Sequence, residues 1–366
     1  MSLRRPQGGH RRVSVIVPSY NRASFLESTL GSIFGQTVPV HEVLLVDDGS
    51  VDGTRQLVGS LLAKHPAWNG RLRYFLQDNL GKSVALNVAL AAVTGDWIAF
   101  NDSDDWWLPR KLELQFEALD RHPEAGACFT DSHYVNNAKF QKTAFEEREL
   151  NYTTEFGLEH DVPHLYAEAA WSGIFMQTVL VRREIMDAVG PFDPSLRMSM
   201  DADFVFRLGL VTPMCFVNHP LVEIDRTPGR RIGLMTQHPI GSFERLEVHE
   251  YLQSKWLSLA AEPRPDIRQG LLNGRSCTQS ELANRYLLRG DFRTSRRVLL
   301  KAIRQNPMIR LVLKLIGCTL APGLVQLAVR KREERSARKR ASGLPVPQGS
   351  GGADHDPIAA GYRTAI

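Results

Sequence analysis

The stretch "WIAFNDSDDWW", residues 97–107, decides the expected fold. Its first four residues, Trp97–Phe100, have the length and apolar composition of a buried strand. Three carboxylates follow closely, at Asp102, Asp104 and Asp105. Open α/β sheets bind ligands just beyond the carboxyl ends of their parallel strands. The stretch therefore predicts a ligand site at the end of a central strand.

Similar apolar runs alternate with helical periods over the first 130 residues. We expect strands at Val13–Val17, Val43–Val46, Leu72–Leu76, Trp97–Phe100 and Ala125–Phe129. This alternation is typical of a sheet with helices on its faces, so the fold class is α/β. A capping box, Ser24–Glu27, predicts the start of the first helix, and Pro109 is expected to be the first residue of a later one.

The second half of the chain changes character twice. Residues 136–170 are polar and weakly periodic, which predicts a mobile loop or lid. Regular elements return from Ile174, with a helix beginning near Asp201. After His238 only helices are expected, at Ser242–Ala260, Arg268–Leu288 and Phe292–Gln305. We predict a flexible N-terminus (1–12), an α/β domain (13–238), a helical C-terminal region (239–330) and a basic, disordered tail (331–366).

Charge and cysteine content exclude several classes of protein. The net charge of +5 is concentrated in a local basic segment near residues 330–340, which lacks the interleaved aromatics of a nucleic-acid-binding surface. The four cysteines are far apart with no CxxC spacing, which argues against a zinc site or a disulfide framework and indicates a reducing compartment, the cytoplasm. The apolar run at 13–17 is too short for a secretion signal and favours a strand.

The apolar segment Met308–Val329 raises the question of a membrane. Lys314 and the Ala321–Gly323 break interrupt a span of the required length. Two interpretations remain open. The segment is either an interfacial amphipathic helix, which with the basic cluster makes peripheral contact with the inner face of a membrane through 308–340, or a helix packed against the α/β domain.

The acidic residues at the strand ends indicate a metal. Asp47 and Asp48 end the strand at 43–46, as the three carboxylates at 102–105 follow theirs. Clustered carboxylates repel one another, and a hard cation with oxygen ligands, Mn²⁺ or Mg²⁺, explains them most simply. Aspartates also cap turns and helices, and we favour that structural role for Asp47 and Asp52.

Four blocks of sequence, in order, together resemble glycosyltransferase family 2. They are "VSVIVPSYNRASFLESTLGSIFGQT", "EVLLVDDGSVDGT", "NLGKSVALNVALAAVTGDWIAFNDSDDWWLP" and "MDADFVFRL", within about residues 12–230. The resemblance implies a GT-A fold, a Rossmann-like mixed sheet with flanking helices, here followed by a helical appendage. It also implies an inverting, metal-dependent transfer of a sugar from a nucleotide-diphosphate donor, usually a UDP-sugar, to a hydroxyl of a glycan or lipid-linked acceptor. Synthesis of a surface polysaccharide, cell-wall polymer or other glycoconjugate is the usual role of the family.

The resemblance also implies roles for individual residues. Pro18, Tyr20 and Arg22 would line the nucleotide pocket, and Asp48 would accept a hydrogen bond from the ring N–H of the base. The remaining implied site residues are the metal ligands Asp104 and Asp102, the near-equal candidate Asp105, and the general base Asp201.

Two further residues follow from their position in the chain. Gly81 and Lys82 lie in a loop after a strand, where they would either approach the phosphates or form a plain turn with a solvated lysine. Asn87, on the following helix, is expected to buttress that loop. Trp106 and Trp107 are expected to pack in the core more readily than to stack on a sugar.

The sequence departs from the family at two places. Met200 stands where the family commonly has a glutamate before the base, and "DRTPGRRIG" replaces a downstream histidine, with Arg226, Arg230 and Arg231 as candidate diphosphate ligands. These departures keep open a non-catalytic sugar-nucleotide binding module. A nicotinamide-dependent oxidoreductase is disfavoured because no GxGxxG follows the first strand.

Overall fold

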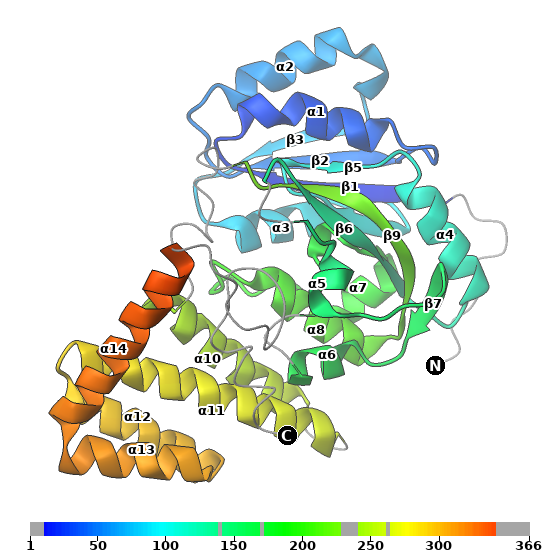
Figure 1. Cartoon of the computed structure of the whole chain (residues 1–366). Coiled ribbons are helices and arrows are strands. Elements are labelled where there is room, and N and C mark those ends of the chain that lie inside the picture. Colours follow the sequence, from blue (N-terminus) through cyan, green and yellow to red (C-terminus); the bar gives the residue numbers. More distant parts are fainter. Residues whose placement is uncertain (1–10, 138–140, 169–171, 228–240, 261–263, 342–366) are drawn as a thin grey trace. The chain divides into compact units, whose positions relative to one another are not determined.

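A computed structural model describes residues 11–137, 141–168, 172–227, 241–260 and 264–341 (Figure 1). The chain divides into two compact units. The first comprises Met1–Val162 and Gly173–Ile232, and the second comprises Pro163–Ser172 and Gly233–Ile366. Each unit is described by itself.

The first unit is built on a mixed sheet, which has nine strands in the described residues. Four adjacent parallel strands begin it, in the order β3 (Leu72–Leu76), β2 (Glu42–Asp47), β1 (Val13–Ser19) and β4 (Trp97–Phe100). These strands confirm the first four predicted from sequence. Their carboxyl ends share one edge, so the loops that follow them converge there.

The other half of the sheet contains antiparallel pairs. Next to β4 runs β8, which is antiparallel to it, and β6 and β9 pair in parallel further along. The strands β5 and β7 both pair antiparallel with β9. Their bounds are β5 (Asp105–Trp107), β6 (Ala127–Val135), β7 (Phe156–Glu159), β8 (Leu180–Arg182) and β9 (Met214–Asp225). The predicted strand at 125–129 thus begins two residues later and runs further.

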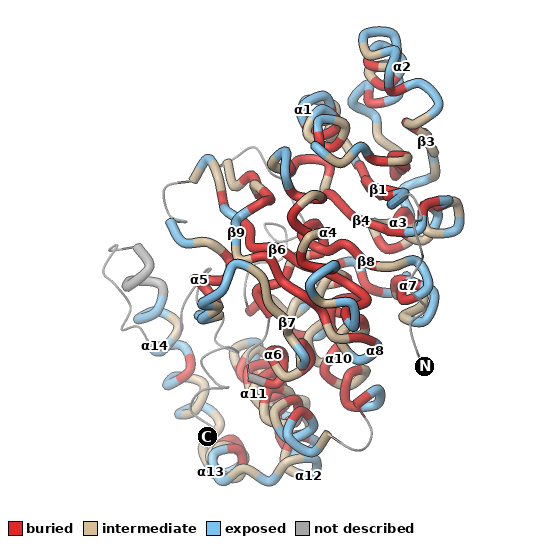
Figure 2. The backbone as a smooth tube through the Cα atoms, turned by 90° about the vertical axis from the view of Figure 1, so that its right-hand side faces the viewer, coloured by how far each residue is buried: buried red, intermediate tan, exposed pale blue. Residues whose placement is uncertain are grey.

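Helices cover both faces of the parallel strands (Figure 1). The helices α1 (Ala23–Phe34), α2 (Thr54–Lys64) and α4 (Lys111–Arg121) share one buried cluster with alternate residues of β1 and β2. The helix α3 (Lys82–Leu90) packs on the opposite face. Buried residues concentrate in the central strands (Figure 2). Strands buried on both faces explain the continuous apolar runs in the sequence.

Two helices begin at residues other than those predicted. The capping box at Ser24 is wrong, because α1 already starts at Ala23, and the Asp52 carboxylate of another loop accepts the Ala23 N–H at 2.9 Å. Pro109 is not a first helical residue either. The helix α4 starts at Lys111, and the Pro109 carbonyl is instead bound by the Thr37 N–H at 2.9 Å. In both cases a distant segment, and not a local cap, fixes the helix start.

The loop or lid predicted at 136–170 is also wrong for the described part of that segment. It contains α5 (Ala144–Arg148), β7 and α6 (Val162–Glu168). Phe145 is buried, and the Tyr152 ring stacks on Phe216 of β9 with 3.8 Å between centroids. Elements this short show no sequence period, so their aromatic contacts with β9 had no local signal.

The first unit is completed by α7 (Arg183–Val189), α8 (Met200–Val211) and short 3₁₀ helices at Pro66–Trp68 and Met176–Thr178. The predicted helix near Asp201 is therefore confirmed.

A buried glutamate joins the amino-terminal ends of three strands. The Glu42 carboxylate accepts hydrogen bonds at 2.7 Å from the Ser14 and Thr94 hydroxyls, the Thr94 N–H and the Arg73 guanidinium. Burial alone would raise the pKa of Glu42, but these bonds outweigh it and lower the pKa to about 2. The carboxylate form is therefore strongly favoured in the folded protein.

We expect Glu42→Gln to lower the free energy of unfolding at pH 7 by up to about 3 kcal/mol, from a pKa about 2.5 units below its usual value. A lowered folded-state pKa contributes stability that is complete above about pH 4.5 and disappears as the pH falls toward 2. Urea denaturation of both proteins at several pH values measures this. Wild type and variant should converge between pH 4.5 and 2. A difference that does not narrow over this range would contradict the assignment.

The second unit is helical. It consists of α10 (Phe243–Leu259), α11 (Pro265–Leu288), α12 (Phe292–Gln305), α13 (Ile309–Leu320) and α14 (Pro322–Ala341). The first three confirm the helices expected after residue 238. Tyr166 belongs to the same unit and packs edge-on against Trp256, with 5.0 Å between ring centroids.

The basic tail differs from its prediction up to Ala341. Residues 331–341 continue α14, so the disorder predicted from 331 is wrong for them. Ion pairs between Arg332 and Glu281 (2.9 Å) and between Glu333 and Arg285 (2.7 Å) hold this part of α14 on α11. Residues 342–366 lie outside the described residues.

The segment 308–329 forms α13 and the start of α14, which separate at Ala321 as the sequence indicated. A Cβ on Gly317 would lie 3.0 Å from the Val325 side chain, so the glycine permits close packing of the two helices. Among the described residues, no helix combines the length and apolar composition that crossing a membrane requires.

Candidate active site

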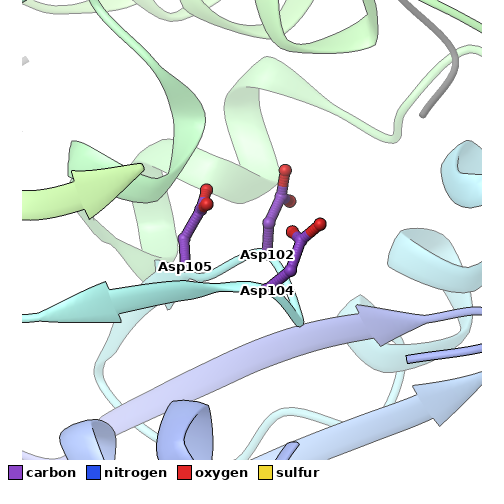
Figure 3. A group of neighbouring side chains, drawn as sticks. All are labelled: Asp102, Asp104 and Asp105. Atoms are coloured by element: carbon purple, nitrogen blue, oxygen red, sulfur yellow. The ribbon is translucent and has the colours of Figure 1, made fainter. Parts of the chain in front are cut away.

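Three carboxylates project from the turn between β4 and β5. Asp102 and Asp104 lie in the turn, which the Asp105 N–H closes by donating to the Asp102 carbonyl at 3.2 Å. One oxygen from each carboxylate lies within 4.8 Å of the others. Figure 3 shows all three side chains projecting to the same side. The acidic cluster predicted from "FNDSDDWW" is therefore one compact group of oxygen ligands.

Two cations from other strand ends reach this acidic turn. Lys82 Nζ lies 2.5 Å from Asp102 Oδ1, and Arg22 Nε lies 3.2 Å from Asp104 Oδ2. Lys82 follows β3 and Arg22 follows β1, so both arrive because parallel strands share their carboxyl edge. Lys82 is thus not a solvated lysine of a plain turn.

The electrostatics of Lys82 show which acids surround it. Burial would lower the pKa of its ammonium group, but the carboxylates of Asp102, Asp201 and Asp104 outweigh this and raise the pKa. Asp201 comes from a segment about 100 residues further along the chain. The structure therefore brings the implied general base and the acidic turn around one lysine.

Asp105 differs from its two neighbours. Its side chain is fully buried, and its oxygens accept from Gln177 Nε2 at 2.8 Å and from the Asp225 N–H at 3.2 Å. Asp102 is partly exposed and Asp104 is 7% exposed. Asp105 is therefore the innermost member of the group, next to β9, and Asp102 is the most exposed.

The first loop is tied to the second. Asn21 has a left-handed backbone (φ 52°) and donates its N–H to Ser50 Oγ at 2.8 Å, while its side chain accepts the Val51 N–H at 2.9 Å. This conformation directs Arg22 toward the acidic turn. Tyr20 beside it is 46% exposed, and Pro18 is buried in β1.

Asp48 holds the loop that carries Lys82. Its carboxylate accepts from Gln77 Nε2 at 2.7 Å and from the Leu80 and Gly81 N–H groups at 2.9 Å each. Gly81 has φ 99°, which is costly for any residue with a Cβ. The implied contact of Asp48 with a nucleotide base stays a prediction. The loop-holding role had no signal in the sequence.

Asp47 and Asp52 have the structural roles that the sequence favoured. Asp47 accepts from the Tyr74 hydroxyl at 2.6 Å and from the Ser50 N–H at 2.8 Å. Burial raises the pKa of Asp52, but hydrogen bonds from Thr54 and the Ala23 N–H outweigh it and leave the pKa lowered. Both aspartates therefore organise loops.

Asp201 is positioned through α3. The loop before α8 is bound by Ser83, whose hydroxyl donates to the Leu196 carbonyl at 2.7 Å. The Asn87 side chain makes two further hydrogen bonds of 2.8 Å. Its Nδ2 donates to the Phe192 carbonyl, and its Oδ1 accepts from the Phe192 N–H. The prediction that Asn87 buttresses the Gly81 loop was therefore wrong. It holds the loop that leads to Asp201.

Sequence reasoning missed a cation near this site. A Cβ on Gly81 would have the Arg197 guanidinium as its nearest neighbour, with Nη1 3.8 Å away. The only available signal was a basic residue just before the "MDADFVFRL" block. Of the arginines proposed for a diphosphate, Arg226 lies over the Tyr134 ring at 5.2 Å, and Arg230 and Arg231 lie outside the described residues.

Other residues of these blocks are structural. Asp203 is buried and pairs with Arg207 at 2.9 Å one turn along α8. Trp107 is buried in β5, with the Lys111 ammonium 4.0 Å from its ring centroid. The burial of Trp107 agrees with the packing expected from sequence.

Part of the chain resembles a known protein family. Residues 14–173 match the family model of glycosyl transferase family 2. This segment of the chain is therefore similar to that family. The match includes β1, β2, the Gly81 loop and the acidic turn, whereas Asp201 lies beyond it.

Proteins similar to this chain include an uncharacterised glycosyltransferase of Nostoc sp., 29% identical over 50% of the chain and 54% of the relative. A putative teichuronic acid biosynthesis glycosyltransferase of Bacillus subtilis, TuaG, is 42% identical over 29% of the chain and 41% of the relative. The chain thus spans about half the length of these curated relatives.

Solved structures establish the fold as GT-A. S. aureus TarS 1-349, in complex with UDP-GlcNAc, has a TM-score of 0.63 at 19% identity, over 90% of this chain and 92% of that one. The mannosyltransferase PcManGT from Pyrobaculum calidifontis, in complex with GDP-Man and Mn²⁺, has a TM-score of 0.53 at 19% identity, over 92% and 89%. The chain therefore has a GT-A fold followed by a helical region.

Proposed function

We propose that this chain is an inverting glycosyltransferase that moves a sugar from a nucleotide-diphosphate donor to an acceptor hydroxyl. One observation carries the proposal. The carboxylates of the acidic turn at 102–105, which lies in the segment similar to family 2, and of Asp201 both raise the pKa of the partly buried ammonium group of Lys82. This supports a donor-binding group and a base that act near one point at the carboxyl edge of the sheet.

The acidic turn fits a divalent metal ion. Three carboxylates within 4.8 Å offer the hard oxygen ligands that Mn²⁺ and Mg²⁺ prefer. Asp104 and Asp102 would hold the ion, with Asp105 behind them. When bound, such an ion would neutralise negative charge that develops on the departing diphosphate.

Protein cations would assist at the same place. Lys82 keeps its charge because three carboxylates raise its pKa. Together with Arg22 and Arg197 it supplies fixed positive charge where a diphosphate would lie. Pro18, Tyr20 and Asp48 would line the nucleotide side of the pocket.

Asp201 would act as the general base. Its carboxylate would accept the proton of the acceptor hydroxyl as that oxygen attacks the anomeric carbon. The new glycosidic bond forms while the bond from the anomeric carbon to the diphosphate breaks, so a single displacement inverts the centre.

The donor is proposed to be a UDP-sugar and the acceptor a glycan or lipid-linked saccharide. UDP and UDP-GlcNAc are bound in the TarS structures, and the TuaG relative is named for teichuronic acid biosynthesis. These relatives support a role in surface polysaccharide or cell-wall synthesis. A place in the cytoplasm is proposed from the wide spacing of the cysteines.

A non-catalytic sugar-nucleotide binding module is favoured by one observation. Met200, which stands where the family commonly has a glutamate, is buried beside Asp201 and offers the base no charged neighbour. Such a module would bind the sugar nucleotide without breaking the bond between the sugar and the diphosphate.

Isothermal titration of UDP, GDP and dTDP, with and without Mn²⁺, tests the donor site. The proposal expects metal-dependent binding of one nucleotide and, with the matching sugar nucleotide, release of the diphosphate over time. Binding without release would favour the module. Absence of binding to all three nucleotides would refute the donor site.

Replacing Asn87 with alanine should displace Asp201 while leaving the nucleotide-binding residues in place. The loss of two bonds to Phe192 should lower stability by about 1–3 kcal/mol and misplace Asp201. We expect kcat to fall by a factor of about 10–100 while nucleotide Kd changes little. Val88→Ala, at a partly exposed neighbour on α3, is the matched control. Equal losses in binding and kcat would contradict this role.

A further inference from the structure

A stripe of large apolar side chains lies exposed on α13. Ile309, Leu313, Ile316 and Leu320 are 73%, 61%, 47% and 80% exposed. Their spacings of four, three and four residues place them on one face of the helix. On α14, Leu324 and Leu327 are also exposed, at 70% and 47%. We call these six side chains the apolar stripe.

The stripe is separate from the face that α13 uses for packing. Leu311 and Cys318 on its other side are buried in the core of the helical unit, with Leu299 and Ala302 of α12. Six of the sixteen large hydrophobic side chains exposed in the described residues belong to the stripe. Such concentration marks an interaction surface and not the scattered exposure of ordinary proteins.

The charge around the stripe is almost entirely positive. Residues 292–341 contain 14 lysines and arginines and only two acidic residues, whereas the whole chain has a net charge of +5. The rest of the chain is therefore net negative. Within the stripe itself, from 309 to 327, there is no acidic residue. Arg310, Arg330, Lys331 and Arg335 are exposed at its flanks.

We propose that the apolar stripe and its basic flanks are a binding surface for an anionic lipid bilayer. Exposed leucine and isoleucine would enter the headgroup boundary, and the flanking cations would meet lipid phosphates. The helices would lie in the plane of the membrane, because none in the described residues is long and apolar enough to cross it. This inference does not depend on the proposed transfer reaction.

The charge favours a lipid surface over other occupants. A second copy seated on the same face would bring two strongly basic segments together, which is unfavourable. Single-stranded nucleic acid favours aromatic stacking platforms, whereas the stripe is wholly aliphatic. An anionic bilayer offers both an apolar interior for the stripe and phosphate groups for its basic flanks.

Flotation of the full-length chain with vesicles tests the proposal. We expect binding to phosphatidylcholine vesicles that contain phosphatidylglycerol, weaker binding to phosphatidylcholine alone, and loss of binding at high salt. The double variant Leu313→Glu, Leu320→Glu should lower partitioning by about tenfold or more, because two charges then replace inserted side chains. Arg330→Gln with Lys331→Gln should lower it by about fivefold per charge.

A matched control carries the same charge change elsewhere. Leu76→Glu with Leu259→Glu alters two leucines that are 53% and 45% exposed and lie outside the stripe. This control should float like wild type, and circular dichroism should show all variants folded. No vesicle binding by wild type, or equal binding by the stripe variant, would overturn the proposal. So would a dimer, seen by light scattering, that the stripe variant abolishes while vesicle binding is unchanged.

Discussion

Replacing Asp201 with asparagine should lower kcat by a factor of about 10²–10⁴ while the donor Kd stays nearly unchanged. Asparagine keeps the shape of the side chain and the oxygen that accepts the Ala202 N–H at 2.9 Å, but it cannot take a proton at neutral pH. The acidic turn and Lys82 remain intact. Initial rates of nucleotide release, together with titration calorimetry of the donor, measure the two effects separately.

Asp203→Asn is the matched control for this prediction. Asp203 lies two residues away in α8, but it is buried in an ion pair with Arg207. Its loss should lower the melting temperature, since it leaves the guanidinium without its carboxylate, and should leave kcat of the folded protein largely intact. If Asp201→Asn kept most of its kcat, Asp201 would not be the base.

Replacing Asp104 with asparagine should abolish the metal-dependent part of nucleotide binding. The substitution removes one negative charge from the group of three carboxylates and leaves Arg22 without its 3.2 Å partner. Both changes raise positive charge where a divalent cation would bind. We expect Mn²⁺-dependent affinity for the nucleotide to fall by at least about 100-fold, beyond the effect of removing an outer-shell partner.

Titration of Mn²⁺ and then of nucleotide into both proteins measures this loss. Asp52→Asn provides the control, because Asp52 organises the starts of α1 and α2 and lies outside the acidic turn. It should reduce stability but keep the dependence on metal. A normal response of Asp104→Asn to Mn²⁺ would remove Asp104 from the ligand set.

Much of the fold was predictable because burial leaves a local pattern. The strands β1, β2 and β4 are buried on both faces, so each appears as a nearly continuous apolar run, and α12 matched its expected bounds. The acidic turn was predictable for a related reason. Its three aspartates lie within four residues, so no long-range contact is needed to bring them together.

Contacts between distant segments could not be predicted in the same way. The starts of α1 and α4 are fixed by Asp52 and Thr37, which are remote in sequence, and local capping rules chose the wrong residues. The strand β7 pairs with β9, and the Tyr152 ring before it stacks on Phe216 of β9. Each of these elements depends on a partner residue that lies outside the short stretch of sequence used to predict it.

The sequence by itself determined the class of fold, the acidic turn and the family resemblance, since all three are encoded in residues that are close in the chain. Only the tertiary structure decided that Asp48 holds the Gly81 loop, that Asn87 positions the segment leading to Asp201, and that α13 leaves an apolar face exposed. The physical reason is that hydrogen bonds and burial depend on distance in space. That distance between remote segments is set by the packing of the whole unit.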